Sequence, residues 1–257
     1  MGLSRARERL LARLRERRGR EREALFLVEG IRSAGEALAA RARVSFALVS
    51  PRLGELAGGA ELRGRLEEAR LDTVELSDGE LAAVADTQTS QGVLLVCAEP
   101  DAPSWPAGEG PLLVLDGIQD PGNVGTLLRA AGAFGVADAL VLDGSADPYN
   151  AKAVRAAAGA IFRARLHQAR WEDAAPALLE RGPLLVADMG GRDVAALRPP
   201  ATWTLVIGSE GAGPRPAVRA AATEVVSIPM PGGTESLNAG VAGSILLYVL
   251  TQEGTRG

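Results

Sequence analysis

The sequence predicts an α/β protein built from two units, and three observations carry this prediction. Apolar segments of strand length alternate with segments of helical periodicity over most of the 257 residues. A stretch with four prolines and two glycines, residues 99–111, interrupts the alternation once. Three glycine-rich stretches in the second half each follow a predicted strand, which is where open parallel sheets bind their ligands.

The composition narrows the class of protein. Apolar residues make up 47% of the chain, enough for a core, but no run of about 18 of them appears, so no membrane contact is expected. Because Cys97 and His167 are the only residues of their kinds, neither an intrachain disulfide nor a Cys/His metal cluster is expected. We expect Cys97 to be a buried strand residue and His167 to be structural. The N-terminus lacks the apolar core of a secretory signal, so a cytoplasmic location is expected.

The first 22 residues concentrate positive charge in a chain whose net charge is −4. They hold nine arginines and three glutamates, and helical spacing places Leu3, Leu10 and Leu14 on one face. This basic helix is either a solvated helix or an arm that contacts phosphates, and the sequence leaves both interpretations open.

Residues 1–100 are predicted to form a small α/β/α unit that includes the basic helix 1–22. Ser77 or Asp78 is the expected cap of its last helix. Its strands are expected at 24–30, 44–50, 71–76 and 91–100, and its further helices at 31–40, 61–69 and 77–85. Residues 101–110 are predicted to be an interdomain linker.

Residues 111–257 are predicted to form a second α/β unit with a mainly parallel sheet. Its strands are expected at 112–117, 139–144, 162–166, 183–189, 202–209 and 224–230. Its helices are expected at 125–134, 150–160, 171–180 and 236–251.

Each glycine-rich stretch carries polar residues suited to a ligand. LDGIQDPGNVGTLLRAAGAFG places Asn123 in a turn and Arg129 nearly two helical turns later, so both could face one site. LVIGSEGAGPRP leaves backbone groups open, and Glu210 could accept from a ribose or tie down the loop. In IPMPGGTESLNAGVAGSILLY, Ser236 is the expected cap of the last helix and Asn238 would lie at its second position, near a helix end that can hold an anion.

These motifs resemble the three motifs of the SpoU/TrmH RNA ribose 2′-O-methyltransferases, in the SPOUT superfamily. LFLVEGIRSAGEAL also resembles the N-terminal RNA-binding domain of the ribosomal-RNA members, and DPYNAKAVRAAAGA resembles family sequence. The resemblance implies a trefoil-knotted C-terminal α/β domain, a homodimer with the site at its interface, and S-adenosyl-L-methionine as cofactor. The implied cofactor contacts fall at Ile207, Gly208, Glu210, Gly211, Ile228, Met230, Ser236, Leu237 and Asn238.

The implied reaction is methyl transfer to a ribose 2′-hydroxyl of RNA, with a 23S ribosomal RNA nucleotide as the favoured substrate. The family assigns hydroxyl activation to the arginine at position 129, but a guanidinium stays protonated in proteins. We therefore expect Arg129 to bind the adjacent phosphate and stabilise the developing alkoxide. Asn123, Glu210, Ser236 and Asn238 complete the expected catalytic set, and further RNA contacts are expected at Arg32, Lys152 and Arg155.

Two departures and three alternatives accompany this interpretation. Ala239-Gly240 stands where the family usually has valine and serine, and Pro214 and Pro216 replace a leucine-rich continuation. One alternative is a catalytically inactive knotted RNA-binding or ribosome-assembly factor, and another is a tRNA 2′-O-methyltransferase. A dinucleotide-dependent enzyme is disfavoured, because no G-x-G-x-x-G opens a helix.

Overall fold

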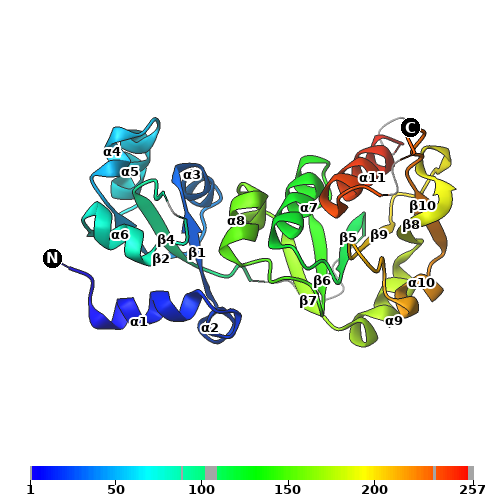
Figure 1. Ribbon diagram of the computed structural model, residues 1–257, viewed down its shortest axis with the longest axis horizontal. Helices are drawn as coiled ribbons and strands as arrows, with labels where there is room; N and C mark the ends of the chain where they lie inside the picture. Colours follow the sequence, from blue (N-terminus) through cyan, green and yellow to red (C-terminus); the bar gives the residue numbers. More distant parts are fainter. Residues whose placement is uncertain (1, 88, 102–108, 234–235, 254–257) are drawn as a thin grey trace. The chain divides into compact units, whose positions relative to one another are not determined.

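The computed structural model describes residues 2–87, 89–101, 109–233 and 236–253, which form two compact units (Figure 1). The first unit comprises Met1–Asp101 and Tyr149–Phe162, and the second comprises Ala102–Pro148 and Arg163–Gly257. Most of the predicted linker 101–110 lies outside the described residues. None of the helices in the described ranges is long and apolar enough to cross a membrane.

The first unit is built on a four-stranded sheet in the order β1-β4-β2-β3. Strands β1 (Leu25–Glu29) and β2 (Val44–Val49) both pair antiparallel with β4 (Val93–Ala98), and β3 (Thr73–Glu75) runs parallel beside β2. Apolar side chains on both faces of β4 explain its central place, since it must be covered from two sides. The prediction that Cys97 is a buried strand residue is confirmed, because it lies in β4 and is fully buried.

Helices cover the sheet of the first unit. Leu11 and Leu14 of α1 and Leu81 of α6 join the core formed by β1, β2 and β4, while α3 packs against β1, β4 and α5. Ser77 begins α6 with a capping box closed by Glu80. The six helices in this part of the described chain are α1 (Arg5–Leu14), α2 (Arg17–Glu23), α3 (Ile31–Ala39), α4 (Arg52–Glu55), α5 (Gly59–Glu68) and α6 (Asp78–Val84).

Several arginines of the basic helix 1–22 hold the N-terminal helices to the first unit. Arg20 is buried and donates to the carbonyl of Leu14 at 2.8 Å, which satisfies the end of α1. Arg7 lies over the ring of Phe46, with its guanidinium carbon 4.6 Å from the ring centroid. The segment is therefore more than a solvated helix, and it forms the two helices α1 and α2 where a single helix was expected. Six of its nine arginines are exposed, namely Arg5, Arg9, Arg15, Arg17, Arg18 and Arg22.

Residues 149–162 pack with the first unit although they follow two strands of the second. This segment contains α8 (Ala151–Ala157), which contacts β1, and a short 3₁₀ turn at Ala160–Phe162. The ring of Phe26 in β1 lies 4.9 Å from that of Tyr149 and 5.9 Å from that of Phe162. The sequence-based boundary places the segment within 111–257, because aromatic contacts distant in sequence leave no periodic signal.

The second unit contains a six-stranded sheet in the order β10-β8-β9-β5-β6-β7, and every pairing in it is parallel. The buried strands are almost wholly apolar, as parallel strands covered on both faces must be. The strand expected at 162–166 begins later, because the 3₁₀ turn occupies 160–162. The strands are β5 (Leu112–Asp116), β6 (Asp138–Leu142), β7 (Arg165–Ala169), β8 (Leu184–Asp193), β9 (Thr204–Gly208) and β10 (Glu224–Ser227).

Four α-helices of the described second unit cover the two faces of this sheet (Figure 1). Helices α9 (Trp171–Arg181) and α10 (Pro216–Ala220) contribute Trp171, Leu178 and Val218 to the core on one face. Helices α7 (Pro121–Ala133) and α11 (Ala239–Glu253) pack together on the other face. A β-carbon on Gly243 would lie 2.2 Å from Cδ2 of Leu127, so glycine is what permits this close helix approach.

Candidate active site

The strand order reverses between β5 and β9 in the second unit. From β5 the chain adds β6 and β7 on one side, and then places β8 and β9 on the other. Such a reversal separates the loops that follow the two central strands and opens a crevice at their carboxyl ends. Two of the three glycine-rich stretches follow β5 and β9, so this crevice is where the structure brings them together.

Asn123 lies at this crevice, in the first turn of α7. Asp120 caps the helix by accepting from the backbone N–H of Gly122 at 2.8 Å. Asn123 is 7% exposed, and its side-chain amide donates a hydrogen bond to the Glu210 carboxylate from the loop after β9. The first and second glycine-rich stretches are thus joined through two of the predicted catalytic residues.

The loop after β9 folds back on itself. The backbone groups of Ser209 and Gly213 exchange two hydrogen bonds of 3.1 and 3.0 Å, which places Glu210 at the exposed tip. A β-carbon on Gly208 would lie 2.1 Å from the nitrogen of Pro214. No side chain fits at that approach, so Gly208 is required for the loop to close, and Pro214 is buried against it.

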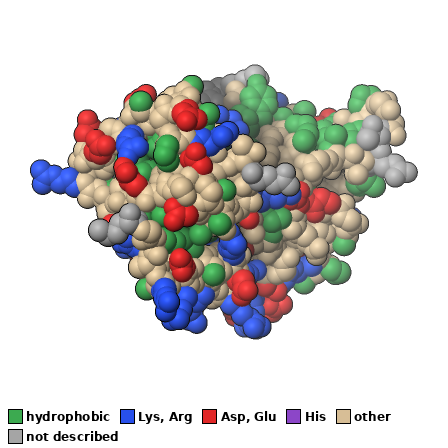
Figure 2. Space-filling model, turned by 60° about the vertical axis from the view of Figure 1, so that its left-hand side comes forward, with side chains coloured by type: hydrophobic (Ala, Val, Ile, Leu, Met, Phe, Trp, Pro, Cys, Tyr) green, Lys and Arg blue, Asp and Glu red, His purple; other side chains and the backbone are tan. Residues whose placement is uncertain are grey.

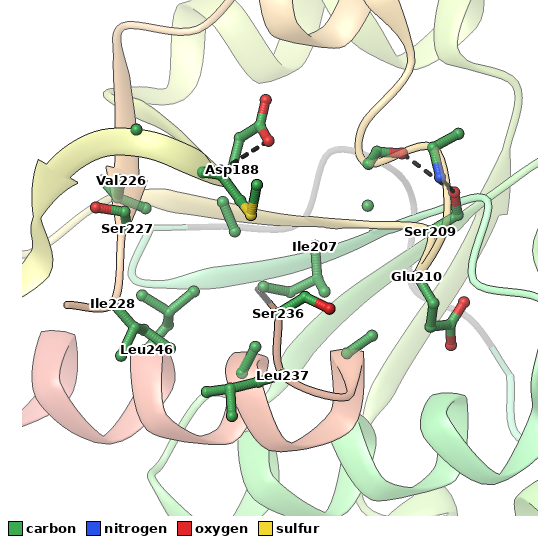
Figure 3. A pocket seen from close by; sticks show the side chains of 18 of the residues that line it. Asp188, Ile207, Ser209, Glu210, Val226, Ser227, Ile228, Ser236, Leu237 and Leu246 are labelled. Atoms are coloured by element: carbon green, nitrogen blue, oxygen red, sulfur yellow. Dashed lines mark hydrogen bonds between the residues drawn. The ribbon is translucent and has the colours of Figure 1, made fainter. Parts of the chain in front are cut away.

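A cavity of about 490 Å³ opens beside this loop, at the carboxyl ends of β8, β9 and β10. Figure 3 shows Ser209 and Glu210 on one side of it, Val226–Ile228 on the opposite side, and Leu237 toward α11. Its lining includes eight of the nine predicted cofactor-binding residues, namely Ile207, Gly208, Glu210, Gly211, Ile228, Met230, Ser236 and Leu237.

Asn238 does not line the cavity, because it caps α11. The helix begins at Ala239, and the Oδ1 of Asn238 accepts from the backbone N–H of Val241 at 3.2 Å. The expectation that Ser236 is the cap and Asn238 the second helical residue is therefore wrong. Both residues are good caps, and the sequence alone does not say where the first turn starts. Ser236 is left free to line the cavity.

Arg129 lies on the exposed face of α7. Within the described ranges it makes no hydrogen bond or ion pair with another residue. Six residues correspond to about 600° around a helix, so Arg129 points about 120° away from Asn123. The expectation that both side chains face one site is wrong for a single chain, because Asn123 points inward and Arg129 points outward.

Sequence reasoning missed the wall of the cavity that follows β8. Asp188, Met189 and Gly190 line it, and Met189 is 64% exposed. Asp188 forms an ion pair with Arg219 of α10 and accepts from the backbone N–H of Met189 at 2.7 Å. The signal was available, because β8 pairs directly with β9 and its carboxyl end therefore lies at the same edge.

The other predicted RNA contacts lie in the first unit. Arg32 is exposed in the first turn of α3, whose Ile31 N–H donates to the Oε1 of Gln91 at 2.8 Å. Lys152 is exposed in the first turn of α8. Arg155 of the same helix forms an ion pair with Asp86, with Nη1 3.0 Å from Oδ2. Its positive charge is therefore partly neutralised within the first unit.

No group of three or more His, Cys, Asp or Glu side chains is placed to hold a metal ion within the ranges that the structure describes. His167 lies in β7, and it is 5% exposed. Its burial lowers its pKa below the ordinary value, an effect that the nearby Asp138 carboxylate opposes. The titratable side chains that line the cavity are those of Asp188 and Glu210.

Comparison with known proteins identifies this arrangement. Residues 110–248 match the model of the SpoU rRNA Methylase family. The chain belongs to this family. Residues 7–95 of this SpoU-family chain match a second model, the MRM3-like substrate binding domain. The family predicted from the three motifs is thereby confirmed, and so is the fold class of a knotted α/β domain with a small N-terminal α/β unit.

Similar proteins cover almost the whole SpoU-family chain. The chain is 32% identical over 243 residues to 23S rRNA (guanosine(2553)-2′-O)-methyltransferase RlmP of Bacillus subtilis, with 93% of each chain covered. A solved TrmH-family protein from Porphyromonas gingivalis has 34% identity and a TM-score of 0.83, with 97% of this chain and 98% of that chain covered. The SpoU methyltransferase AviRb from Streptomyces viridochromogenes, solved with AdoMet, has 26% identity and a TM-score of 0.87, with 99% and 100% covered.

The departure of this SpoU-family chain at Gly240 has a local explanation. A β-carbon at this position would lie 3.1 Å from the Oδ1 atoms of both Asn123 and Asn238. Glycine therefore leaves room between the two asparagines where the family usually has serine. The departure changes the packing at the start of α11 and leaves the cavity lining intact, because Gly240 does not line the cavity.

Proposed function

We propose that this chain transfers a methyl group from S-adenosyl-L-methionine to a ribose 2′-hydroxyl of RNA, with a 23S ribosomal RNA nucleotide as the favoured substrate. The observation that carries the proposal is the junction of Asn123 and Glu210 beside the cavity. It joins two family motifs at the strand-order reversal. Family membership supports the reaction, and the names of RlmP and AviRb support the substrate and the cofactor respectively.

The cavity fits an adenosyl cofactor in size and chemistry. Its volume of about 490 Å³ lies within the range usual for small-molecule sites. Ile207, Met230 and Leu246 offer apolar surface, while the loop Gly208–Gly213 offers backbone donors and acceptors to an adenine or a ribose. When bound, the cofactor supplies a methyl group on a positively charged sulfur. Glu210 provides a carboxylate beside the site, while the carboxylate of Asp188 is paired with Arg219.

Arg129 is assigned the RNA side of the reaction. Its exposed guanidinium has no partner in the described part of the chain, so its donors are available to a phosphate. It binds the phosphate next to the target ribose and stabilises the alkoxide that develops as the hydroxyl loses its proton. Asn123 and Glu210 fix the loop that faces the cofactor, while Ser236 and Asn238 shape the start of α11.

RNA binding in the first unit is assigned to individual basic side chains. Figure 2 shows acidic and basic side chains interspersed on the face in view, in keeping with the net charge of −4. Arg32 at the start of α3 and Lys152 at the start of α8 are exposed at helix N-termini, which also attract phosphates. We assign them, with Arg155 in a lesser role, to RNA contact, and the match to a substrate binding domain supports this.

The protein is proposed to be a cytoplasmic homodimer. Three large apolar side chains of α11, Val241, Ile245 and Tyr248, are 47%, 36% and 51% exposed and lie on one helical face. A second copy packed against it would bury the face.

A binding and transfer experiment tests the proposal. The full chain is titrated with S-adenosyl-L-methionine by calorimetry, then incubated with tritiated cofactor and either ribosomal RNA, free and in large subunits, or tRNA. Binding followed by label in 23S RNA is expected. Label in tRNA alone would assign the tRNA alternative. Binding without transfer to any RNA would favour the inactive RNA-binding factor.

A further inference from the structure

An arginine directly after the glycine loop connects that loop to the ends of two strands, β5 and β6. Arg215 donates its backbone N–H to Oδ2 of Asp116 at 2.7 Å and its Nε–H to Oδ1 at 2.5 Å. Its Nη1 donates to Oδ1 of Asp143 at 3.0 Å, and its Nη2 to the backbone carbonyl of Asp143 at 2.6 Å. Asp116 ends β5 and Asp143 follows β6, while Arg215 itself precedes α10.

The acid at the centre of this cluster is deeply buried. The side chain of Asp116 is 1% exposed, against 50% for Asp143 and 26% for Arg215. A buried carboxylate is stable only when it is paired and hydrogen-bonded, because burial removes it from water. Asp116 therefore requires a positively charged, hydrogen-bonding partner at this place, and its two oxygens fix both the backbone and the side chain of Arg215.

The cluster defines the downstream end of the loop that lines the cavity. The loop leaves β9 at Gly208 and reaches Arg215 seven residues later, and Gly208–Gly213 all line the cavity. The loop tip is held by the bond from Asn123 to Glu210, and its neck by the Ser209–Gly213 pairing. Arg215 is the anchor that connects this loop to β5, the strand that also precedes Asn123.

We propose that Arg215 is a positioning residue for the cofactor loop, which it holds against the first motif so that Glu210 and the loop backbone keep the geometry needed to bind S-adenosyl-L-methionine. This inference rests on the proposed function. Arg215 lies outside the cavity lining, so it acts through the loop and not by touching the cofactor. In the sequence only the prolines on either side of it, Pro214 and Pro216, are unusual. In the structure Arg215, which lies between them, makes the hydrogen bonds to Asp116 and Asp143.

Arginine is required because the contacts form a fork. The guanidinium reaches Asp116 through Nε and Asp143 through both Nη atoms, which are spread over one rigid plane. A lysine ammonium is a compact point charge on a flexible stem. It can neutralise Asp116 but cannot keep the same three side-chain hydrogen bonds. Arg215→Lys therefore keeps the positive charge and removes the contacts that position the loop.

The test measures cofactor binding and methyl transfer for wild type, Arg215→Lys and a matched control, Arg165→Lys. Arg165 also forks onto a buried acid, with Nε and Nη2 2.7 and 2.6 Å from the oxygens of Asp138, but at the amino ends of β6 and β7, away from the cavity. We expect Arg215→Lys to raise the Kd and the KM for S-adenosyl-L-methionine about tenfold, as lost charged hydrogen bonds would, with a much smaller change in kcat. Arg165→Lys should leave both constants at the wild-type value.

A second variant guards against a purely structural effect. Asp143→Ala removes one arm of the cluster and keeps the buried Arg215–Asp116 pair, and it should raise the same Kd by a smaller factor. A lower melting temperature with an unchanged Kd in Arg215→Lys would overturn the inference, because Arg215 would then only stabilise the fold. If the wild type binds cofactor but methylates no RNA, the proposed function fails while the binding comparison still decides the role of Arg215.

Discussion

The side-chain amide of Asn123 donates to the carboxylate of Glu210, which joins the first turn of α7 to the loop after β9. The two residues are 87 positions apart in the sequence. Asn123 is buried, so a lost partner would leave a polar group without compensation, at a typical cost of about 1–3 kcal/mol. The contact is therefore both part of the fold and part of the proposed site.

Replacing Glu210 tests this contact. Glu210→Ala removes the acceptor of Asn123, and we expect it to lower kcat/KM for methyl transfer by about 10- to 100-fold. Glu210→Gln keeps a side-chain oxygen that can accept the bond, so it should retain more activity than Glu210→Ala. Steady-state kinetics with tritiated cofactor measure both variants, and equal activities for the two would contradict a hydrogen-bonding role.

The glycine loop offers a pair of matched substitutions. Gly208→Ala places a β-carbon 2.1 Å from the backbone nitrogen of Pro214, so the loop cannot close and cofactor binding should be lost. Gly211→Ala has no atom within 4 Å of the added carbon, so its melting temperature should match that of the wild type. Thermal unfolding with and without S-adenosyl-L-methionine distinguishes them. A cofactor-induced shift in Gly208→Ala as large as in the wild type would refute this account of the loop.

The exposed face of α11 predicts dimer formation. Ile245→Glu places a charge at the centre of this face and should convert a dimer to a monomer, measured by light scattering after size-exclusion chromatography. Leu179→Glu is the control, because Leu179 is 51% exposed on α9, on the opposite face of the sheet. A wild-type protein that is monomeric at high concentration would remove the basis for this prediction.

His167 predicts a loss of stability in mild acid. Burial lowers its pKa in the folded protein, while the unfolded chain takes up a proton near the ordinary value of about 6.5. Below that pH the unfolded state binds more protons, so the free energy of unfolding falls as the pH falls toward the folded pKa. Urea unfolding between about pH 7 and pH 5 measures this slope. His167→Gln should flatten it, and an unchanged slope would assign the effect to other groups.

The architecture of the second unit could be predicted from the sequence, because parallel strands and their helices leave strong periodic patterns. Most residues that line the cavity could be predicted as well, since the loops after β9 and β10 contain two motifs that resemble those of a known family. The wall after β8 was missed because Asp188 and Met189 belong to no such motif. The packing of residues 149–162 with the first unit could not be predicted, because the contacts of Phe26 with Tyr149 and Phe162 join segments distant in sequence.

Side-chain direction was the least predictable property. Spacing alone suggested that Asn123 and Arg129 face one site, but the burial of Leu127 and Leu128 sets the rotation of α7 and turns Arg129 outward. RNA contact was expected at Arg155, and the basic helix 1–22 was left open between a solvated helix and a phosphate-contacting arm. Acids from distant segments pair with Arg155 and with Arg7. Such pairings depend on long-range packing, which a single sequence does not reveal.

Replacing Arg129 should change activity without changing stability. Arg129→Ala should reduce methyl transfer by about 100-fold or more, the typical loss when a transition-state donor is removed. The melting temperature should stay unchanged, because the side chain is exposed and unpaired within the described residues. Arg170→Ala is the control for loss of a surface arginine. Near-normal transfer by Arg129→Ala would show that the residue does not serve the reaction.

The most direct test of the central claim is the position of the transferred methyl group. Ribosomal RNA labelled by the wild-type protein with tritiated S-adenosyl-L-methionine is hydrolysed in alkali, which cannot cleave the linkage on the 3′ side of a 2′-O-methylated ribose. The account predicts that the label survives in a dinucleotide and is lost with Arg129→Ala. Label released as a mononucleotide would mean methylation of a base, and would contradict the proposed reaction.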